Sequence, residues 1–348
     1  MPLAVTVGVV ANPASGRDIR RLVAGASVFD NAEKGNMVYR LMVGLGAVGV
    51  ERVLMMPAGS GLYDSLERTM RAAYSSKIER PLPELELIEM TVHHDARDTV
   101  EAVEAMLERG VKAIAVLGGD GTSRIVARHC ADDLPLCTLS TGTNNAFPEM
   151  REATVAGLAT GLVATGRIGD EALRREKILH VGLNGDERRD CALVDVAVNS
   201  ERFVGARALW RPRDVSEIVV SSARPDAVGL SSIAGLLDPT GHDAPHGLHI
   251  RLAPPESAET VLTVPLAPGL VVPVGVDEVD RVELGETVEL TPGIGSVALD
   301  GEREIEVGPT DEVEVGLNSD GPLTIDVAAA MSEAARRGLL NGDARLPY

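Results

Sequence analysis

The segment Gly118-Gly119-Asp120-Gly121-Thr122 carries the clearest chemical signal in this sequence. It lies between an apolar run at 113–117, which predicts a buried strand, and a helical pattern at 123–130. Glycine allows a tight turn there and lets a phosphate come within hydrogen-bond reach of the backbone N–H groups. Thr122 is predicted to cap the following helix, whose positive end favours a phosphate. An ordinary Asp-Gly turn is the alternative, but three glycines and an acid after a strand favour phosphate binding.

A second polar turn follows the first predicted strand. The apolar run Ala4–Ala11 ends at Asn12-Pro13-Ala14-Ser15-Gly16-Arg17. Asn12 and Ser15 offer side-chain donors, Gly16 offers accessible backbone, and Arg17 offers a fixed positive charge for a phosphate. Taken alone, this turn is equally consistent with a plain loop. Together with the glycine turn, it predicts a phosphate clamp with two sides.

A third polar turn, Ser140-Thr141-Gly142-Thr143-Asn144-Asn145, follows the predicted strand at 135–140. Its small polar side chains suit the rim of a ribose or phosphate site, and a polar helix entry is the alternative. The residues of the three turns that we predict to bind the nucleotide are Asn12, Ser15, Gly16, Arg17, Gly118, Gly119, Gly121, Thr122, Thr141, Gly142, Thr143, Asn144 and Asn145.

Asp120 and Asp195 are the candidate catalytic residues. Asp120 lies in the glycine turn, next to the predicted phosphate. If a phosphoryl group is transferred there, Asp120 could orient the accepting hydroxyl or a metal ion bound to the phosphates. Aspartate is a weak base toward an alcohol, so we predict orientation of that hydroxyl rather than its full deprotonation before transfer. Asp195 interrupts the apolar run 192–198, and a carboxylate there needs a partner, a ligand or solvent. Asp300-Gly301 separates two alternating runs and predicts a hairpin turn.

Two other patterns are not assigned to function. Gly44-Leu45-Gly46-Ala47-Val48-Gly49 satisfies the GxGxxG fingerprint of dinucleotide sites, but a predicted helix precedes it and a strand follows. We therefore predict a helix C-terminus and turn. His93-His94-Asp95 predicts a helix entry with Asp95 as cap, because adjacent extended residues point in opposite directions and no third ligand has helical spacing. No dedicated metal site is predicted.

The order of elements predicts two regions of different fold class. In the first half, apolar strand-like runs alternate with helical patterns, which is typical of a mostly parallel sheet covered on both faces. After about Gly169 the chain consists of short strand-like runs separated by Gly and Pro, with few helices between them. A final helical pattern spans 328–340.

Length, composition and charge set limits on the protein class. The 348 residues suit two domains, and 45% apolar content is ample for packed cores. No apolar run has the roughly 20 residues that a membrane-spanning helix needs, and the N-terminus lacks a signal-peptide pattern. Three cysteines without CxxC spacing fit free thiols in a reducing cytoplasm. The formal charge of -19 repels nucleic acid and anionic membranes, so neither is an expected partner.

The ordered set of motifs resembles a kinase superfamily. The GGDGT motif at 118–122 is similar to the signature shared by NAD kinases with diacylglycerol and sphingosine kinases. Residues 12–16 are similar to the NPxSG segment of the lipid-kinase branch, 140–145 to its GTxN segment, and Asp300-Gly301-Glu302 to its DGE segment. The nearest resemblance is to the ATP-NAD kinase-like AcoX proteins, linked to acetoin catabolism, and it extends over nearly the whole chain.

The resemblance implies a three-layer α/β domain at 1–168, an all-β sandwich domain at 169–322, and a C-terminal segment at 323–348 that packs on the first domain. The active site would lie between the two domains. The implied activity is transfer of the ATP γ-phosphoryl group to a hydroxyl, with Mg²⁺ on the nucleotide and NAD or a NAD-like dinucleotide as the first candidate acceptor. A homodimer or homotetramer is also implied. The alternatives are a non-catalytic nucleotide- or dinucleotide-binding protein and a kinase for another small polyol or lipid.

Two segments depart from the NAD kinase pattern and concern the acceptor. NAD kinases carry Asn before the acid on the strand that here reads Ala192-Leu193-Val194-Asp195, so Val194 should remove hydrogen bonds to the acceptor. Their hydroxyl-rich substrate loop corresponds to 229–235, which has fewer hydroxyl groups. The candidate acceptor-binding residues are Ser231, Ser232, Asp300 and Glu302.

Overall fold

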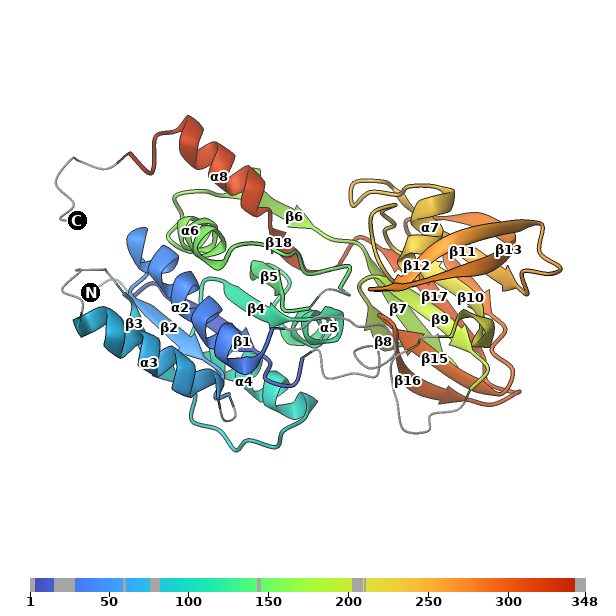
Figure 1. Cartoon of the computed structure of the whole chain (residues 1–348), viewed down its shortest axis with the longest axis horizontal. Coiled ribbons are helices and arrows are strands. Elements are labelled where there is room, and N and C mark those ends of the chain that lie inside the picture. The colour runs from blue at the N-terminus through green and yellow to red at the C-terminus, as the bar shows by residue number, and fades with distance from the viewer. Residues whose placement is uncertain are drawn as a thin grey trace.

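The computed structural model of the protein shows two packed regions that lie end to end (Figure 1). It describes residues 4–15, 29–58, 61–75, 82–142, 145–201, 209 and 211–341. Four of the predicted nucleotide-binding residues, Gly16, Arg17, Thr143 and Asn144, lie outside these ranges. The segment 17–26, whose pattern also predicts a helix, lies outside them as well. No helix in the described parts of the chain combines the length and apolar character that crossing a bilayer requires.

The first region is built on a seven-stranded sheet whose central strands are β1 (Thr6–Ala11) and β4 (Ile114–Gly118). Every residue of these two strands is buried, as expected for parallel strands covered on both faces. Neighbouring strands pair in parallel except the last two. The full order is β3 (Glu84–Leu87), β2 (Arg52–Met55), β1, β4, β5 (Leu136–Ser140), β18 (Leu323–Ile325) and β6 (Leu173–Arg175).

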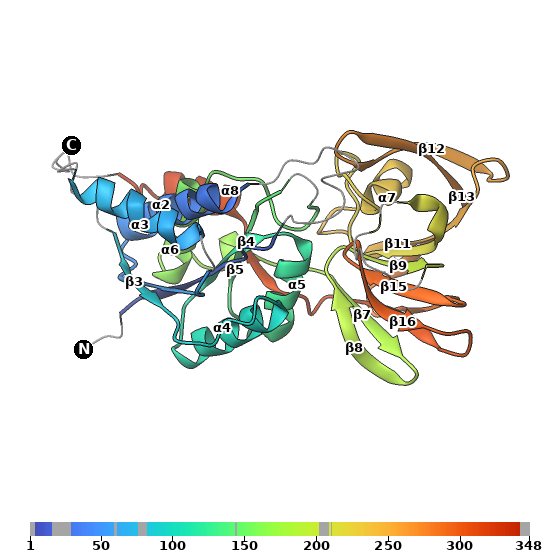
Figure 2. The ribbon, with the colours of Figure 1, turned by 60° about the horizontal axis from the view of Figure 1, so that its bottom comes forward.

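Helices cover both faces of this sheet, so the predicted three-layer α/β arrangement is confirmed (Figure 2). One face packs against α2 (Asn31–Ala47), α3 (Leu62–Ser75), α6 (Ala153–Ala164) and α8 (Val327–Arg336). The other face packs against α4 (Ala96–Glu108) and α5 (Asp120–His129). Asp95 caps α4 by accepting the N–H of Arg97 at 2.9 Å, as predicted.

The GxGxxG segment is the end of a helix, as predicted. Gly44 belongs to α2, and Gly49 follows the helix with φ +96°. The glycines of this helix pair have a packing role, because a Cβ on Gly44 would lie 2.3 Å from the Thr154 carbonyl oxygen. A Cβ on Gly157 would lie 2.2 Å from the Leu41 carbonyl oxygen. The two helices therefore touch through their backbones.

We expect Gly157→Ala to lower the free energy of unfolding by roughly 2 kcal/mol, because α2 and α6 must separate to admit the methyl group. Gly241→Ala is the matched control, because a Cβ at that glycine would meet no atom within 4 Å. Urea unfolding of both variants measures the difference. Equal loss in the two variants would contradict a backbone contact at Gly157.

The second region is an antiparallel sandwich, as predicted. The larger sheet has the order β12 (Thr260–Ala267), β13 (Leu270–Glu283), β11 (His246–Ala253), β10 (Val215–Val220), β9 (Asp195–Asn199), β15 (Gly295–Leu299) and β16 (Glu302–Val307). The smaller sheet has the order β14 (Thr287–Leu290), β17 (Val313–Asn318), β7 (Ile178–Leu183) and β8 (Asp186–Ala192). Apolar side chains of both sheets form one shared core.

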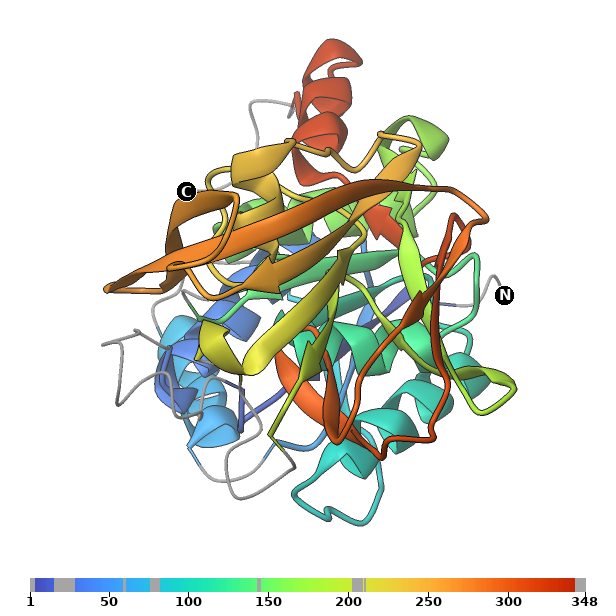
Figure 3. The same ribbon diagram turned by 90° about the vertical axis from the view of Figure 1, so that its right-hand side faces the viewer.

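One helix, α7 (Ser231–Leu237), interrupts the otherwise β-structured region. It packs with β12 and β13 in the core on the outer face of the larger sheet. The orange ribbons of β12 and β13 cross the front of the molecule in Figure 3. The sheets of this region confirm the predicted all-β sandwich, and α7 is one of the few helices that accompany its strands.

The chain crosses between the regions twice, and the crossings are side by side. The Glu176 N–H donates to the Pro322 carbonyl oxygen at 3.0 Å. The Glu176 carboxylate accepts from Thr324 Oγ1 at 2.6 Å, Arg174 Nε at 2.8 Å and His242 Nδ1 at 2.8 Å. After the second crossing, β18 and α8 pack with the first region (Figure 1). The domain boundaries at 168/169 and 322/323 remain predictions.

Candidate functional site

The three polar turns meet at one edge of the first sheet. They follow β1, β4 and β5, which are adjacent parallel strands, so their carboxyl ends lie side by side. Asn12 Nδ2 donates to Thr122 Oγ1 at 3.0 Å, and the hydroxyls of Ser15 and Thr141 lie 2.9 Å apart. The Thr141 N–H donates to the Gly118 carbonyl oxygen at 3.1 Å. The described residues of the three turns are thus brought together.

The helix after the glycine turn starts earlier than expected. Gly119 is the N-cap of α5 and provides no side-chain cap, so the prediction that Thr122 caps this helix is wrong. Thr122 lies in the first turn, where its hydroxyl accepts from Asn12. An N-terminus without a capping side chain presents its first N–H groups and its positive dipole end to an anion.

The glycines of this turn also allow close packing. A Cβ on Gly118 would lie 2.6 Å from Cβ of Thr122, and a Cβ on Gly119 would lie 2.8 Å from Oδ1 of Asn145. The Asn145 Nδ2 donates to the Ser140 hydroxyl at 2.7 Å. Glycine at 119 therefore lets the glycine turn approach the third turn, and glycine at 118 lets the Thr122 side chain pack against the backbone of its own turn.

Lys34 is a residue of this site that the sequence analysis missed. It is 1% exposed, and its Nζ donates to the carbonyl oxygens of Asn12 at 3.0 Å and Ser15 at 3.1 Å. A buried ammonium group thus holds the 12–15 turn and places positive charge beside it. The available signal was a lysine in register with the apolar residues Met37, Val38 and Leu41 of α2.

Asp120 orients the segment that follows the third turn. Its carboxylate accepts the N–H of Ala146 at 3.1 Å and the N–H of Phe147 at 2.8 Å. Backbone N–H groups favour the charged form of a carboxylate and restrict its orientation. Asp120 is therefore a fixed anionic group between the glycine turn and residues 146–147.

The second region contributes the predicted hairpin. Asp300 and Gly301, with φ of +51° and +75°, join β15 to β16 in a two-residue turn. The Asp300 side chain is 0% exposed, and its carboxylate accepts the N–H groups of Leu193 at 3.0 Å and Val194 at 2.8 Å. Burial raises the pKa of the Asp300 carboxyl, while Arg124 and the backbone N–H groups act against that increase.

The same contact corrects a predicted strand. The mainly apolar pattern of 191–199 predicts one strand, but the structure divides this segment into β8 and β9 at Leu193 and Val194. The N–H groups there turn to the buried Asp300 carboxylate. Asp195 opens β9, is 5% exposed, and accepts the Asp300 N–H through its carbonyl oxygen at 2.8 Å.

Glu302, directly after the hairpin turn, lies close to the glycine turn. A Cβ added to Gly121 would lie 3.8 Å from Glu302 Oε2. Nearby, Arg124 and Glu304 pair across the same contact between the regions, although they are 180 residues apart in sequence. The hairpin thus places a half-buried carboxylate of the second region opposite the α5 N-terminus.

The two serines predicted to bind the acceptor, and Val194, are all buried. Ser231 and Ser232 lie in α7, 2% and 0% exposed, and the Ser232 hydroxyl donates to the Gly229 carbonyl oxygen at 2.6 Å. Their segment is a buried helix rather than an open loop. Val194 is 3% exposed and packs in an apolar cluster with Phe147, next to the segment that Asp120 holds.

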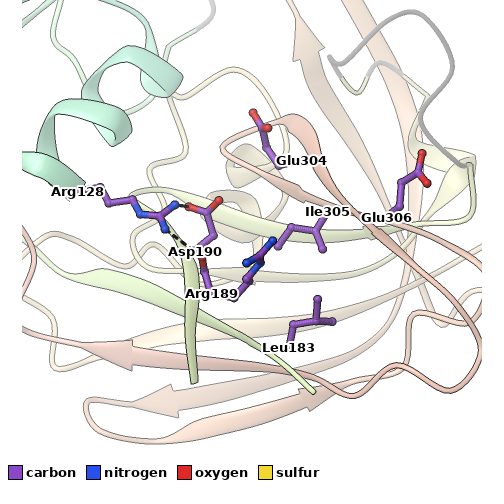
Figure 4. A pocket seen from close by; sticks show the side chains of 7 residues that line it. All are labelled: Arg128, Leu183, Arg189, Asp190, Glu304, Ile305 and Glu306. Atoms are coloured by element: carbon purple, nitrogen blue, oxygen red, sulfur yellow. Dashed lines mark hydrogen bonds and ion pairs between the residues drawn. The ribbon is translucent and has the colours of Figure 1, made fainter. Parts of the chain in front are cut away.

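A polar cavity of about 420 Å³ lies beside this contact between the regions (Figure 4). Its lining residues are Arg128, Leu183, Arg189, Asp190, Glu304, Ile305 and Glu306. None of the predicted nucleotide-binding residues that the structure describes is among them. Among the described residues, no group of three or more His, Cys, Asp or Glu side chains is arranged to hold a metal ion.

Comparisons with known proteins agree with this division into two regions. Residues 7–168 match the family described as the ATP-NAD kinase N-terminal domain, and residues 177–320 match the acetoin catabolism protein X C-terminal domain. A relative named acetoin catabolism protein X, from Cupriavidus necator, is 48% identical over 345 residues, which cover 97% of this chain and 94% of the relative. The chain therefore belongs to the ATP-NAD kinase-like acetoin catabolism protein X (AcoX) family.

Proposed function

We propose that this protein transfers the γ-phosphoryl group of ATP to a hydroxyl group of a small molecule. The observation that carries the proposal is the α5 N-terminus, which has no capping side chain, lies between two polar turns and has buried Lys34 beneath the first of them. Phosphoryl transfer requires mainly positioning and charge stabilisation from a protein. A helix N-terminus and a fixed cation supply both for phosphate groups.

The nucleotide phosphates would bind to the backbone of 118–122 and to the side chains of Asn12, Ser15 and Thr141. Gly16, Arg17, Thr143 and Asn144 stay predicted members of this site. Mg²⁺ fits the acidic side chains present, because it keeps several waters and needs only one or two carboxylates besides the phosphates. Its charge would offset that of the phosphates in a protein of net charge -19.

Asp120 would orient the acceptor hydroxyl or the magnesium ion, with Asp195 and Glu302 on the opposite side. The position of Glu302 near Gly121 supports this assignment. Asp300 would act indirectly, because its carboxylate is fully buried and accepts N–H groups of the protein itself. We therefore assign it to positioning rather than to acceptor contact.

NAD or a NAD-like dinucleotide is the first proposed acceptor, and one observation supports alternatives. Val194 belongs to a buried apolar cluster with Phe147, so its side chain offers no hydrogen bond to a polar acceptor. This favours a smaller polyol or hydroxy ketone, or nucleotide binding without transfer. The named relative is an acetoin catabolism protein, which adds hydroxy ketones to the compounds to be tested.

The test is ADP release measured with NAD, NADH, diols and hydroxy ketones, with each product identified by mass. A phosphorylated product supports the kinase and names its acceptor. Thermal stabilisation by ATP or NAD without ADP formation across the panel would support the binding protein instead.

We also propose that the protein is a cytoplasmic homodimer or homotetramer without nucleic-acid or membrane partners. Cys130, Cys137 and Cys191 are free cysteines. Burial raises the pKa of Cys137 to about 11 and that of Cys191 to about 12, so both remain protonated thiols at neutral pH. Free thiols are typical of a reducing compartment.

We expect Lys34→Met to weaken ATP binding roughly tenfold, which corresponds to about 1.4 kcal/mol. The substitution removes the donor that Asn12 and Ser15 share and the positive charge beside the phosphate turn. Calorimetric titration with a non-hydrolysable ATP analogue measures the affinity. Lys112→Met, at an exposed lysine, is the control. Unchanged affinity in Lys34→Met would argue against a phosphate site at this turn.

A further inference from the structure

Arg124 connects the nucleotide-binding helix to the second region. It lies on α5 one turn beyond the glycine motif, and its side chain is 8% exposed. Its Nη2 lies 2.9 Å from Oε1 of Glu304, its Nη1 3.3 Å from Oδ1 of Asp190, and its Nε 3.7 Å from Oδ2 of Asp300. All three carboxylates belong to the sandwich. A planar guanidinium group can serve several carboxylates at once, which a lysine ammonium cannot reproduce.

Asp300 links Arg124 to Asp195 and Glu302, the carboxylates that we propose to face the acceptor. The Asp300 carboxylate accepts the N–H groups of Leu193 and Val194, and that of Asp195 at 3.4 Å, while the Asp300 N–H donates to the Asp195 carbonyl oxygen at 2.8 Å. Asp195 is thus the last of the three amides that Asp300 holds, and Glu302 follows the Asp300-Gly301 turn. The position of Asp300 therefore determines where the backbone of Asp195 and that of Glu302 lie.

The buried Asp300 carboxylate needs a counter-charge. Removing one partner of a buried ion pair leaves an uncompensated charge, which strongly disturbs the local structure. Arg128, one turn later on α5, contacts Asp190 at 2.8 Å but is 44% exposed. Arg124 is the residue of this helix for which ion pairs with both Asp300 and Glu304 are seen.

We propose that Arg124 is a positioning residue for phosphoryl transfer, which acts through Asp300 to align Asp195 and Glu302 with the nucleotide-binding helix. The proposal rests on the proposed function for its kinetic consequence only. Its structural consequence, ordering of the backbone at 193–195, can be measured whether or not an acceptor is known.

Hydrogen exchange of the backbone amides tests the structural consequence. In Arg124→Met, the amides of 193–195 should exchange at least about tenfold faster than in the wild type, because their acceptor has lost its counter-charge. Arg128→Met is the matched control and should leave exchange at 193–195 unchanged. If Arg124→Met does not fold, Arg124→Lys replaces it. A smaller increase in exchange rate is then expected, because lysine keeps the positive charge but lacks the planar guanidinium group. Unchanged exchange at 193–195 in the folded variant overturns the proposal.

Steady-state kinetics test the second consequence. Arg124→Met should lower kcat at least about tenfold while the KM for ATP stays within about twofold, and Arg124→Lys should recover part of the loss. A general loss of folding would instead lower the fraction of active enzyme, and the loss would not be partly recovered in Arg124→Lys. If the wild type phosphorylates no acceptor, the proposed function fails, and the exchange experiment still decides the role of Arg124. Equal loss of kcat in Arg128→Met would overturn the assignment to Arg124.

Discussion

Replacing Asp120 with asparagine is expected to reduce phosphoryl transfer roughly 100- to 1,000-fold while ATP affinity changes by less than about threefold. The carboxylate accepts the N–H groups of Ala146 and Phe147 and lies in the turn that would hold the phosphates. Asparagine keeps one acceptor oxygen but loses the negative charge that would orient a hydroxyl or Mg²⁺. The N–H groups of α5 that we propose to bind phosphate are backbone groups and should be retained.

Asp98→Asn is the matched control for this experiment. Asp98 is a buried carboxylate that, like the half-buried Asp120, accepts two backbone N–H groups, from His93 at 2.6 Å and His94 at 2.8 Å. It belongs to α4, outside the three turns. Product formation by mass gives the turnover, and calorimetry gives the ATP affinity. Equal activity of Asp120→Asn and wild type would rule out a direct role for the carboxylate.

Removing the Glu176 charge should produce a loss of stability that depends on pH. Burial raises the pKa of this carboxyl, but the hydrogen bond and charge of His242, with Arg174 and Thr324, outweigh it and lower the pKa to about 2 from 4.5. A group with a lowered folded-state pKa contributes stability that is present above pH 4.5 and lost as the pH falls toward 2. The shift corresponds to roughly 3 kcal/mol.

Urea unfolding of wild type and Glu176→Gln between pH 6 and pH 3 measures this contribution. The difference in unfolding free energy should be largest near pH 6 and should shrink below about pH 4.5, because the Glu176 carboxylate takes up its proton in the unfolded chain before it does so in the folded protein. Glu259→Gln, at an exposed glutamate, is the control and should show almost no difference at any pH. A difference that stays constant down to pH 3 would mean that the Glu176 charge does not join the two crossings.

Arg124, Asp300 and Glu176 place ionic contacts at two different parts of the boundary between the regions. Arg124 and Asp300 lie beside the glycine turn, whereas Glu176 joins the two crossing segments. Phosphoryl transfer would require the acceptor carboxylates to keep a fixed distance from the nucleotide. Loss of Arg124 should therefore affect turnover, and loss of Glu176 should first affect stability.

Much of the first region follows from local sequence pattern. Strands β1 and β4 are continuous apolar runs because both faces of a parallel sheet are buried. Polar turns at the carboxyl ends of such strands must lie together, so the sequence pattern is enough to group Asn12, Thr122 and Thr141. The Asp300-Gly301 hairpin is likewise predictable, since the two-residue turn requires positive φ.

What the sequence alone determined was therefore the order of the elements, the two fold classes and the polar turns after the parallel strands. Only the tertiary structure decided which charged groups meet. Leu193 and Asp300 are 107 residues apart, Arg124 and Glu304 are 180 apart, and Lys34 contacts the turn 22 residues before it. Local periodicity reports the environment of a side chain but not its partner across such separations. The hydrogen bonds of the buried Asp300 carboxylate, the break between β8 and β9, and the contact of Lys34 with the 12–15 turn all depend on those distant contacts.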